Sequence, residues 1–332
     1  MRFRQAMMSI FEPIGENSFR PQATKVIYFR QPFNNLGLAY NFSFSTSYFS
    51  PFADCQVTIR NVDSSIARSL EFDPASYRNR PKIEIRAGYS DRKIFFDSIA
   101  NRNILSDSLP IVYTGFPVYY SEDKVVGGRD LTLDVTNISL AFRNKRVNIS
   151  FPADTLITSI LNQVADAAGI NIDISSLTQS PTFSLLAIDN PVTYNHRNVL
   201  TDVFLELAKE YKFSFFTGGS GEILFQPVSE ITQRGAAQEN LINNRTGMIE
   251  HPVGINWTHY EIKTLFGLPN VYNPTNWVRV ESPVFNDNQG GLNQIDAVIV
   301  KADYNFNDSD GDIRYEVSPD GQPISVAPIL RL

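Results

Sequence analysis

The residues with the clearest potential for metal chemistry form the acidic run Asp308-Ser309-Asp310-Gly311-Asp312. Carboxylates at alternate positions around a glycine are typical of calcium-binding loops. If Gly311 is the sixth residue of such a loop, however, Phe306 occupies the first ligand position and Val317 the twelfth, and neither side chain binds a cation. The run therefore predicts an acidic hairpin turn, with a cation site as the alternative.

The other reactive residue types are few and widely spaced. The three histidines, His196, His251 and His259, form no i, i+4 pair and have no clustered cysteines, which argues against a zinc site. The single cysteine, Cys55, lies in an alternating strand pattern, so we interpret it as a small core residue rather than a reactive thiol. The glycine-rich run 218–221 precedes neither a Lys-Ser/Thr pair nor a helix, which favours a plain turn over a phosphate loop.

The sequence contains no motif of a familiar catalytic class. It has no G-x-S-x-G, no P-loop and no H-E-x-x-H. A pair of carboxylates that hydrolyses glycosides is not ruled out by the sequence, because any two of the 35 acidic residues could meet in the fold. No acidic residue, however, stands out in a turn beside aromatic residues that could bind a sugar. We predict no catalytic residues, no cofactor-binding residues, no metal-binding residues and no enzymatic activity.

Composition and charge indicate a globular protein of two or three domains. Of the 332 residues 42% are hydrophobic, and no run of 18 apolar residues could cross a membrane. Residues 1–150 hold 19 Lys and Arg against 14 Asp and Glu, whereas residues 151–332 hold 10 against 21. Because no dense basic run with interleaved aromatic residues occurs, this asymmetry favours contact between a basic half and acidic neighbours over specific nucleic-acid binding.

Alternating apolar residues predict the strands that would position these side chains. In the runs 55–62 and 82–89 every second residue is apolar, so each run can bury one face of an antiparallel sheet. Residues 64–70 favour a helix. The irregular, turn-rich residues 1–35 predict an arm before the first domain. Further strands are expected at 25–29, 38–45, 94–101, 109–113 and 131–138, the last two flanking a turn at 127–128.

A change of period at Phe151 marks a different unit. Apolar residues at helical spacing predict a helix with Asp154 as its N-cap and Gly169 as its C′ residue, and a second helix over 197–211. A shift of 43 residues superposes the two patterns, which predicts a repeated helix–strand unit. The superposed pairs include Leu156 with Val199, Ile160 with Val203 and Leu161 with Phe204.

Strand patterns return after residue 240. They occur at 246–252, 260–266, 277–282 and 297–303, and residues 310–317 are expected to form a turn and a last strand. The chain as a whole is therefore predicted to be mainly β with a small α+β insert.

The order of these segments resembles the baseplate hub proteins of tailed phages, a contractile-tail family related to the spike ring of type VI secretion. The runs Ile59-Arg60-Asn61-Val62, Ala87-Gly88-Tyr89 and 94–99 match short hub motifs at the same spacing, although Asp97 replaces a usual glycine. The strands after residue 240 match in the same order, with Lys301-Ala302-Asp303 where the family has a histidine-containing segment. The resemblance spans roughly residues 36–318.

The resemblance implies an architecture of two tube-like antiparallel β-barrels flanking an α/β middle domain. The first barrel would comprise residues 36–150, the middle domain 151–235 and the second barrel 236–318. An N-terminal arm, 1–35, and a C-terminal arm, 319–332, would complete the chain.

The resemblance also implies a structural function. The hub would be a homotrimer whose pseudo-sixfold ring joins the sixfold tail tube to the threefold spike. Its expected partners are the tail tube protein, the spike protein, the tape measure protein and other baseplate proteins, with viral DNA only as passing cargo and no membrane insertion. The expected location is the virion tail baseplate, after assembly in the host cytoplasm. A tail-associated cell-wall-degrading enzyme is the alternative.

Overall fold

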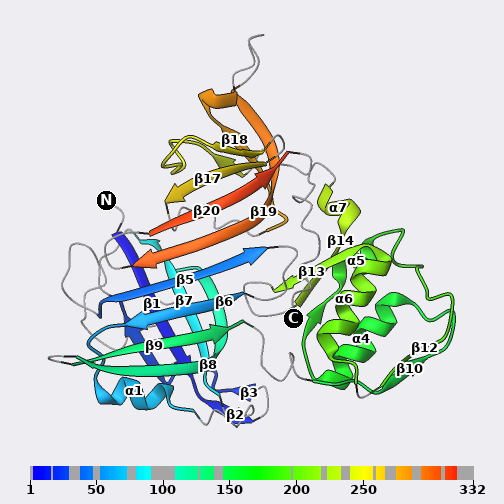
Figure 1. The fold of residues 1–332 in the computed structure, drawn as a ribbon, viewed down its shortest axis with the longest axis horizontal. Helices are drawn as coiled ribbons and strands as arrows, with labels where there is room; N and C mark the ends of the chain where they lie inside the picture. The colour runs from blue at the N-terminus through cyan, green and yellow to red at the C-terminus, as the bar shows by residue number, and fades with distance from the viewer. Residues whose placement is uncertain are drawn as a thin grey trace.

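The structure is a computed structural model that describes residues 3–15, 18–29, 38–47, 53–72, 80–90, 109–125, 128–137, 145–195, 197–217, 223–232, 240–256, 259–265, 274–285, 293–307 and 311–319. It is mainly β, with a smaller unit of helices and short strands beside a long antiparallel sheet (Figure 1). The predicted fold class is thus confirmed in its main feature.

Eight strands stack into one continuous wall (Figure 1). Every neighbouring pair in the wall is antiparallel, so the strands alternate in direction from one end to the other. Both halves of the sequence therefore contribute to a single sheet. In spatial order the wall consists of β16 (Val253–Asn256), β17 (His259–Leu265), β20 (Gly311–Ser318), β19 (Gln294–Asn307), β5 (Tyr40–Ser47), β6 (Asp54–Ile59), β9 (Gly128–Thr136) and β8 (Ile111–Val125).

The sheet continues behind the wall on both sides. The first part of β8 pairs with β7 (Lys82–Ser90), which is followed by β1 (Phe3–Phe11) and β4 (Lys25–Tyr28). The first part of β19 pairs with β18 (Trp277–Glu281), and β18 pairs with β15 (Leu241–Ile242). A single bridge between Phe29 and Leu38 joins the end of β4 to the approach to β5. Because no ladder of pairs closes either half within the described residues, closed barrels remain a prediction.

The prediction of an irregular N-terminal arm is wrong for residues 3–11. These residues form β1, which pairs with β7 over its whole length, and Ala6, Met8 and Ile10 lie in the main core. Met7 is also fully buried, so the strand is covered on both faces at this point. A strand buried on both faces lacks the alternation that reveals a half-exposed strand, which explains the error. The strand expected at 25–29 is confirmed by β4.

The two halves of the wall meet at the pair β19–β5. Seven residue pairs join these strands, from Lys301 with Ser47 to Asn307 with Asn41. Below this junction aromatic rings stack in the core: the Phe44 and Tyr304 centroids lie 4.2 Å apart and those of Phe42 and Phe306 lie 5.2 Å apart. Stacked, buried rings supply a large apolar contact that ties strands far apart in sequence.

The two halves of the wall are structural repeats of each other. Adding 182 to each number in the β8–β9 pairing gives the β19–β20 pairing, so that Lys124 with Arg129 corresponds to Phe306 with Gly311. The shift in pairing register also recurs. It lies between Pro117 and Tyr119 on β8 and between Ile299 and Lys301 on β19. The pairs β6–β9 and β17–β20 also correspond, with a shift of 182 from β9 to β20 and of 205 from β6 to β17, so that Cys55 with Val135 corresponds to Tyr260 with Val317. The wall is therefore two matching four-stranded units.

The remaining strands of the second half correct one prediction. Residues 246–252, expected as a strand, make only an isolated bridge from Met248 to Thr264, and the regular edge strand β16 begins at Val253. The strand expected at 94–101 lies outside the described residues. Hairpin β2 (Pro13–Gly15) with β3 (Ser18–Phe19), helix α1 (Ser64–Leu70) and the 3-10 turn η2 (Pro283–Phe285) complete the two β halves.

The middle unit has its own core and contains the predicted repeat. Helices α4 (Ile157–Ala168) and α6 (Leu200–Tyr211) have equal lengths and start 43 residues apart, as do the paired strands β10 (Ile149–Phe151) and β12 (Val192–Tyr194). Strands also follow both helices, at 172–173 and 213–217, so the predicted helix–strand order is confirmed. The unit also contains β11 (Ile172–Asp173), α5 (Ser175–Gln179), β13 (Phe213–Thr217), β14 (Ile223–Pro227) and α7 (Val228–Thr232).

The two ends of α4 differ in how well the sequence predicted them. Gly169 ends the helix in the left-handed conformation, with φ of 64°, as expected of a C′ glycine. The N-cap is Leu156 rather than Asp154, and it makes no side-chain cap. The Ile157 amide instead donates to the Leu186 carbonyl at 2.9 Å, so a distant backbone group replaces the expected carboxylate.

Candidate interaction surface

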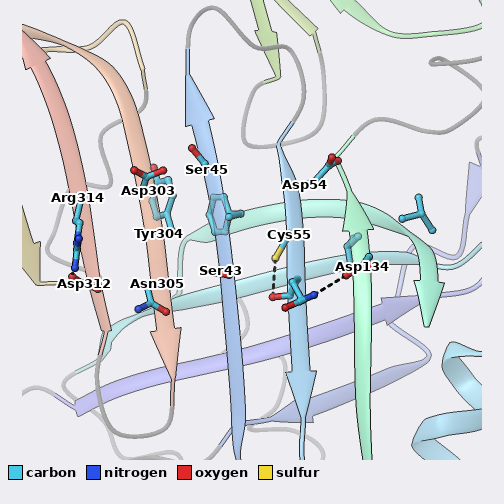
Figure 2. Close-up of a pocket in the computed structure, with 14 residues that line it drawn as sticks. Ser43, Ser45, Asp54, Cys55, Asp134, Asp303, Tyr304, Asn305, Asp312 and Arg314 are labelled. Atoms are coloured by element: carbon cyan, nitrogen blue, oxygen red, sulfur yellow. Dashed lines mark hydrogen bonds and ion pairs between the residues drawn. The ribbon is translucent and has the colours of Figure 1, made fainter. Parts of the chain in front are cut away.

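The outward face of the wall is polar across both units (Figure 2). Along β5 the core residues Phe42 and Phe44 alternate with Ser43 and Ser45, and along β6 the buried Val57 alternates with exposed polar residues. Alternation of this kind buries one face of a sheet and leaves the other to solvent or to a partner. We call this outward face the polar face.

One row of side chains crosses five strands of the polar face at the same level. Asp312 pairs with Asn305, Asn305 with Ser43, Ser43 with Gln56, and Gln56 with Asp134. The Gln56 amide donates to the Asp134 carboxylate at 3.1 Å (Figure 2). Around this row the face is hollowed by an open depression of about 760 Å³ that spans the β19–β5 junction.

Charges on the second unit of the polar face compensate one another. Lys263 Nζ lies 3.5 Å from an Asp312 carboxylate oxygen, and Arg314 Nε lies 3.5 Å from the same atom. Lys301 Nζ lies 2.7 Å from the Asp303 carboxylate. The Lys301–Asp303 pair is exposed and contributes little stability, whereas the carboxylate of Asp312 is buried and two cations compensate its charge.

The first unit of the polar face is acidic and hydroxyl-rich. Along β5, β6 and β9 the charged residues that alternate with the buried ones are Asp54, Asp130 and Asp134, set among serine, threonine, asparagine and glutamine, whereas Arg129 at the start of β9 forms an ion pair with Glu122 at 3.1 Å. The basic excess of residues 1–150 therefore lies elsewhere than on these three strands.

The two reactive groups below the depression are buried. Burial and the nearby charges of Asp134 and Asp54 raise the pKa of the Cys55 thiol far above its usual range. Burial likewise raises the pKa of the Tyr304 hydroxyl. The thiol thus stays protonated at neutral pH, and the interpretation of Cys55 as a core residue is confirmed.

The residues considered for metal chemistry do not converge in the described part of the chain. Asp308–Asp310, His196 and 218–221 lie outside it, whereas Asp312 is the second residue of β20 and joins the ion pairs described above. His251 Nδ1 lies 3.2 Å from Ser282 Oγ, and His259 Nδ1 lies 3.2 Å from Asn256 Oδ1. Among the described residues no three His, Cys, Asp or Glu side chains gather as a metal site would require.

Two carboxyl groups with shifted pKa values lie at the starts of helices, Asp63 as the N-cap of α1 and Asp173 one residue before the N-cap of α5. A hydrogen bond from the Ser65 side chain is the main cause that lowers the pKa of Asp63, which also accepts the backbone amides of Ser65 and Ile66 at 2.7 and 2.9 Å. Ser175 lowers the pKa of Asp173 in the same way, with its amide 2.8 Å from the carboxylate. Both carboxylates serve local structure at the starts of α1 and α5.

Comparisons with known proteins identify the fold. No protein-family model matches the sequence, and no curated protein does either. Among solved structures, the 43 kDa tail protein of prophage MuSo2 from Shewanella oneidensis is similar over 96% of this chain and 98% of its own, with 10% identity and a TM-score of 0.54.

Two further structures extend the comparison to secretion systems. A chain of the Francisella PdpA–VgrG complex matches 96% of this chain and 53% of its own, with 8% identity and a TM-score of 0.60. An E. coli component of the type VI secretion system matches 85% of this chain and 73% of its own, with 12% identity and a TM-score of 0.50. This chain therefore has the fold of phage tail proteins and their secretion-system counterparts, and its resemblance to a baseplate hub-related family is confirmed at the level of the fold.

Proposed function

We propose that the chain is a structural hub of a phage tail baseplate, a homotrimer whose pseudo-sixfold ring joins the sixfold tail tube to the threefold spike. The observation that carries this proposal is the wall of two matching four-stranded units. Three copies of such a chain present six similar units around one axis, so one face of the ring can match a sixfold partner and the other a threefold partner.

In this proposal the polar face lines the lumen of the ring. Support comes from its chemistry: in the first unit Asp54, Asp130 and Asp134 repel phosphates, and in the second unit Lys263, Lys301 and Arg314 are each paired with a carboxylate. Viral DNA and the tape measure protein would pass along such a surface without being held. The middle unit, which lies to one side of the wall in Figure 1, would sit at the periphery or towards the spike.

The proposed partners are further copies of the chain, the tail tube protein, the spike protein, the tape measure protein and other baseplate proteins. The proposed location is the virion tail baseplate, reached by assembly in the host cytoplasm. Within the described residues, no helix has the length and apolar character needed to span a bilayer. The corresponding domains are 36–150, 151–235 and 236–318, with a C-terminal arm at 319–332. Of the residues 1–35 expected as an N-terminal arm, β1 and β4 belong to the sheet of the first domain.

Light scattering and electron microscopy of the purified chain test the proposal. The expected result is a mass of three copies and images of a six-lobed ring. A well-behaved monomer of 37.4 kDa at micromolar concentration contradicts the hub. Incubation with purified cell wall separates the hub from a cell-wall-degrading enzyme, because release of wall fragments is expected only of the enzyme.

A further inference from the structure

Among the described residues, the wall has an edge without a partner strand at each end. β16 pairs with β17 on one side only, and residues 119–125 of β8 pair only with β9 among the described residues. Both edges expose apolar side chains: Ile249, Val253 and Ile255 are 43%, 60% and 48% exposed, and Val125 on β8 is 42% exposed. Open edges with exposed apolar residues favour pairing with another chain, so a partner strand is expected at each.

The direction of the strands shows that the two edges fit each other. The eight strands of the wall alternate without interruption, so its first strand, β16, and its last strand, β8, run in opposite directions. If copies of the wall follow one another around a ring, β8 of one copy meets β16 of the next in the antiparallel sense. The junction between copies then repeats the junction β19–β5 inside each chain.

The internal repeat supplies the register of this contact. The pairing 182 residues apart makes β8 the counterpart of β19, so that Val125 corresponds to Asn307 and Asp123 to Asn305. Through their partners on β6 and β17, the counterpart of Asn41 is Ile249 and that of Ser43 is Val253. Within the chain, Asn307 pairs with Asn41, Asn305 with Ser43 and Asp303 with Ser45.

We propose that β8 of one copy pairs antiparallel with the edge of the next copy formed by Ile249 and β16, with Val125 opposite Ile249 and Asp123 opposite Val253. This inference rests on the proposed ring and adds the edges and the register through which the copies meet. It places the exposed Val125 and Ile249 side chains against each other at the end of the contact. Cross-strand apolar pairs of this kind stabilise a sheet and fix its register.

Cysteine cross-linking tests the register. The double variant Val125→Cys with Ile249→Cys, oxidised under mild conditions, is expected to give a covalent species of three copies on a non-reducing gel, because paired strands bring the two residues within disulfide range. Each single variant is expected to stay uncross-linked. The native Cys55 is buried and does not compete.

An off-register pair provides the matched control. Tyr119 lies six residues before Val125 on the same strand, about 20 Å away at strand spacing, so Tyr119→Cys with Ile249→Cys is expected to give no cross-link. Asp123→Cys with Val253→Cys is a second in-register pair, for use if the first variant does not assemble.

The outcomes separate this inference from the ring on which it rests. Two outcomes overturn the register and leave the ring standing, provided that light scattering still shows trimers. Either neither in-register pair forms a cross-link, or the off-register pair forms one just as readily. A monomeric wild-type chain overturns both.

Discussion

Asp63 shows how one side chain on this protein couples local structure to pH. It caps α1 by accepting the amides of Ser65 and Ile66, and these hydrogen bonds lower its pKa. A carboxyl whose pKa is lower in the folded state stabilises the fold above its unfolded pKa, and this contribution is lost as the pH falls through the folded value.

The variant Asp63→Ala is therefore expected to lower the free energy of unfolding at neutral pH by about 1 kcal/mol, because it removes the cap. The difference from wild type should shrink in acid, as the wild-type carboxyl is protonated. Urea titrations at one protein concentration and several pH values measure this. Asp63→Asn is the control, since asparagine caps equally well without a charge. An Asp63→Ala effect that is constant down to acid pH would argue against the cap.

At the scale of elements, the middle unit is attached to the wall by a small apolar cluster. Trp277 on β18 is 9% exposed and packs with Phe216, Ile231 and Val298, together with Val300. Its indole N–H donates to the Ile231 carbonyl on α7 at 3.1 Å. A contact this limited holds two units together less firmly than a continuous core does.

Trp277→Phe is expected to weaken this attachment by about 1–3 kcal/mol, because the buried Ile231 carbonyl loses its donor while the aromatic contact is largely kept. Trp277→Ala should cost more, about 3–5 kcal/mol, through the cavity that it leaves. Limited proteolysis measures the weakened attachment as faster release of the middle unit. Phe204→Leu, within the middle unit's own core, should destabilise that unit without the same pattern of release. Equal release from wild type and Trp277→Phe would rule out the indole bond as a restraint.

At the scale of the whole molecule, the last described strand ends before the chain does. β20 ends at Ser318, and the remaining residues mix prolines with Ile324, Ile329 and Leu330. A free polar tail would be depleted in such apolar residues, so we expect this segment to dock on a neighbouring subunit or on a tail partner.

Deletion of residues 319–332 is expected to leave the core folded, since every strand pair of the wall lies before it, and to reduce incorporation into tails. Circular dichroism checks the fold, and quantification of the chain in purified tails checks incorporation. Incorporation at the wild-type level would remove the docking role from this segment, whatever the ring does.

The sequence alone determined the features that rest on local periodicity. Alternation identified β6 and β7, where Val57, Ile59, Ile83 and Ile85 are fully buried, and helical spacing identified α4 and α6 with their 43-residue repeat. Helix α1 was predicted with the bounds that it has. These predictions succeed because side-chain periods of 2 and 3.6 are properties of a short segment. The order of the segments also carried the resemblance to hub proteins.

Only the tertiary structure decided which segments pair and which side chains the wall exposes at its edges. The pairing of β19 with β5, the position of β1 beside β7 and the repeat at 182 residues have no local signature, since backbone hydrogen bonds are the same for any pair of strands. The apolar side chains at 246–256 could be read as core, yet Ile249, Val253 and Ile255 lie exposed at an edge. Whether an apolar residue is core or contact depends on what covers it, and that is fixed by the arrangement of distant strands.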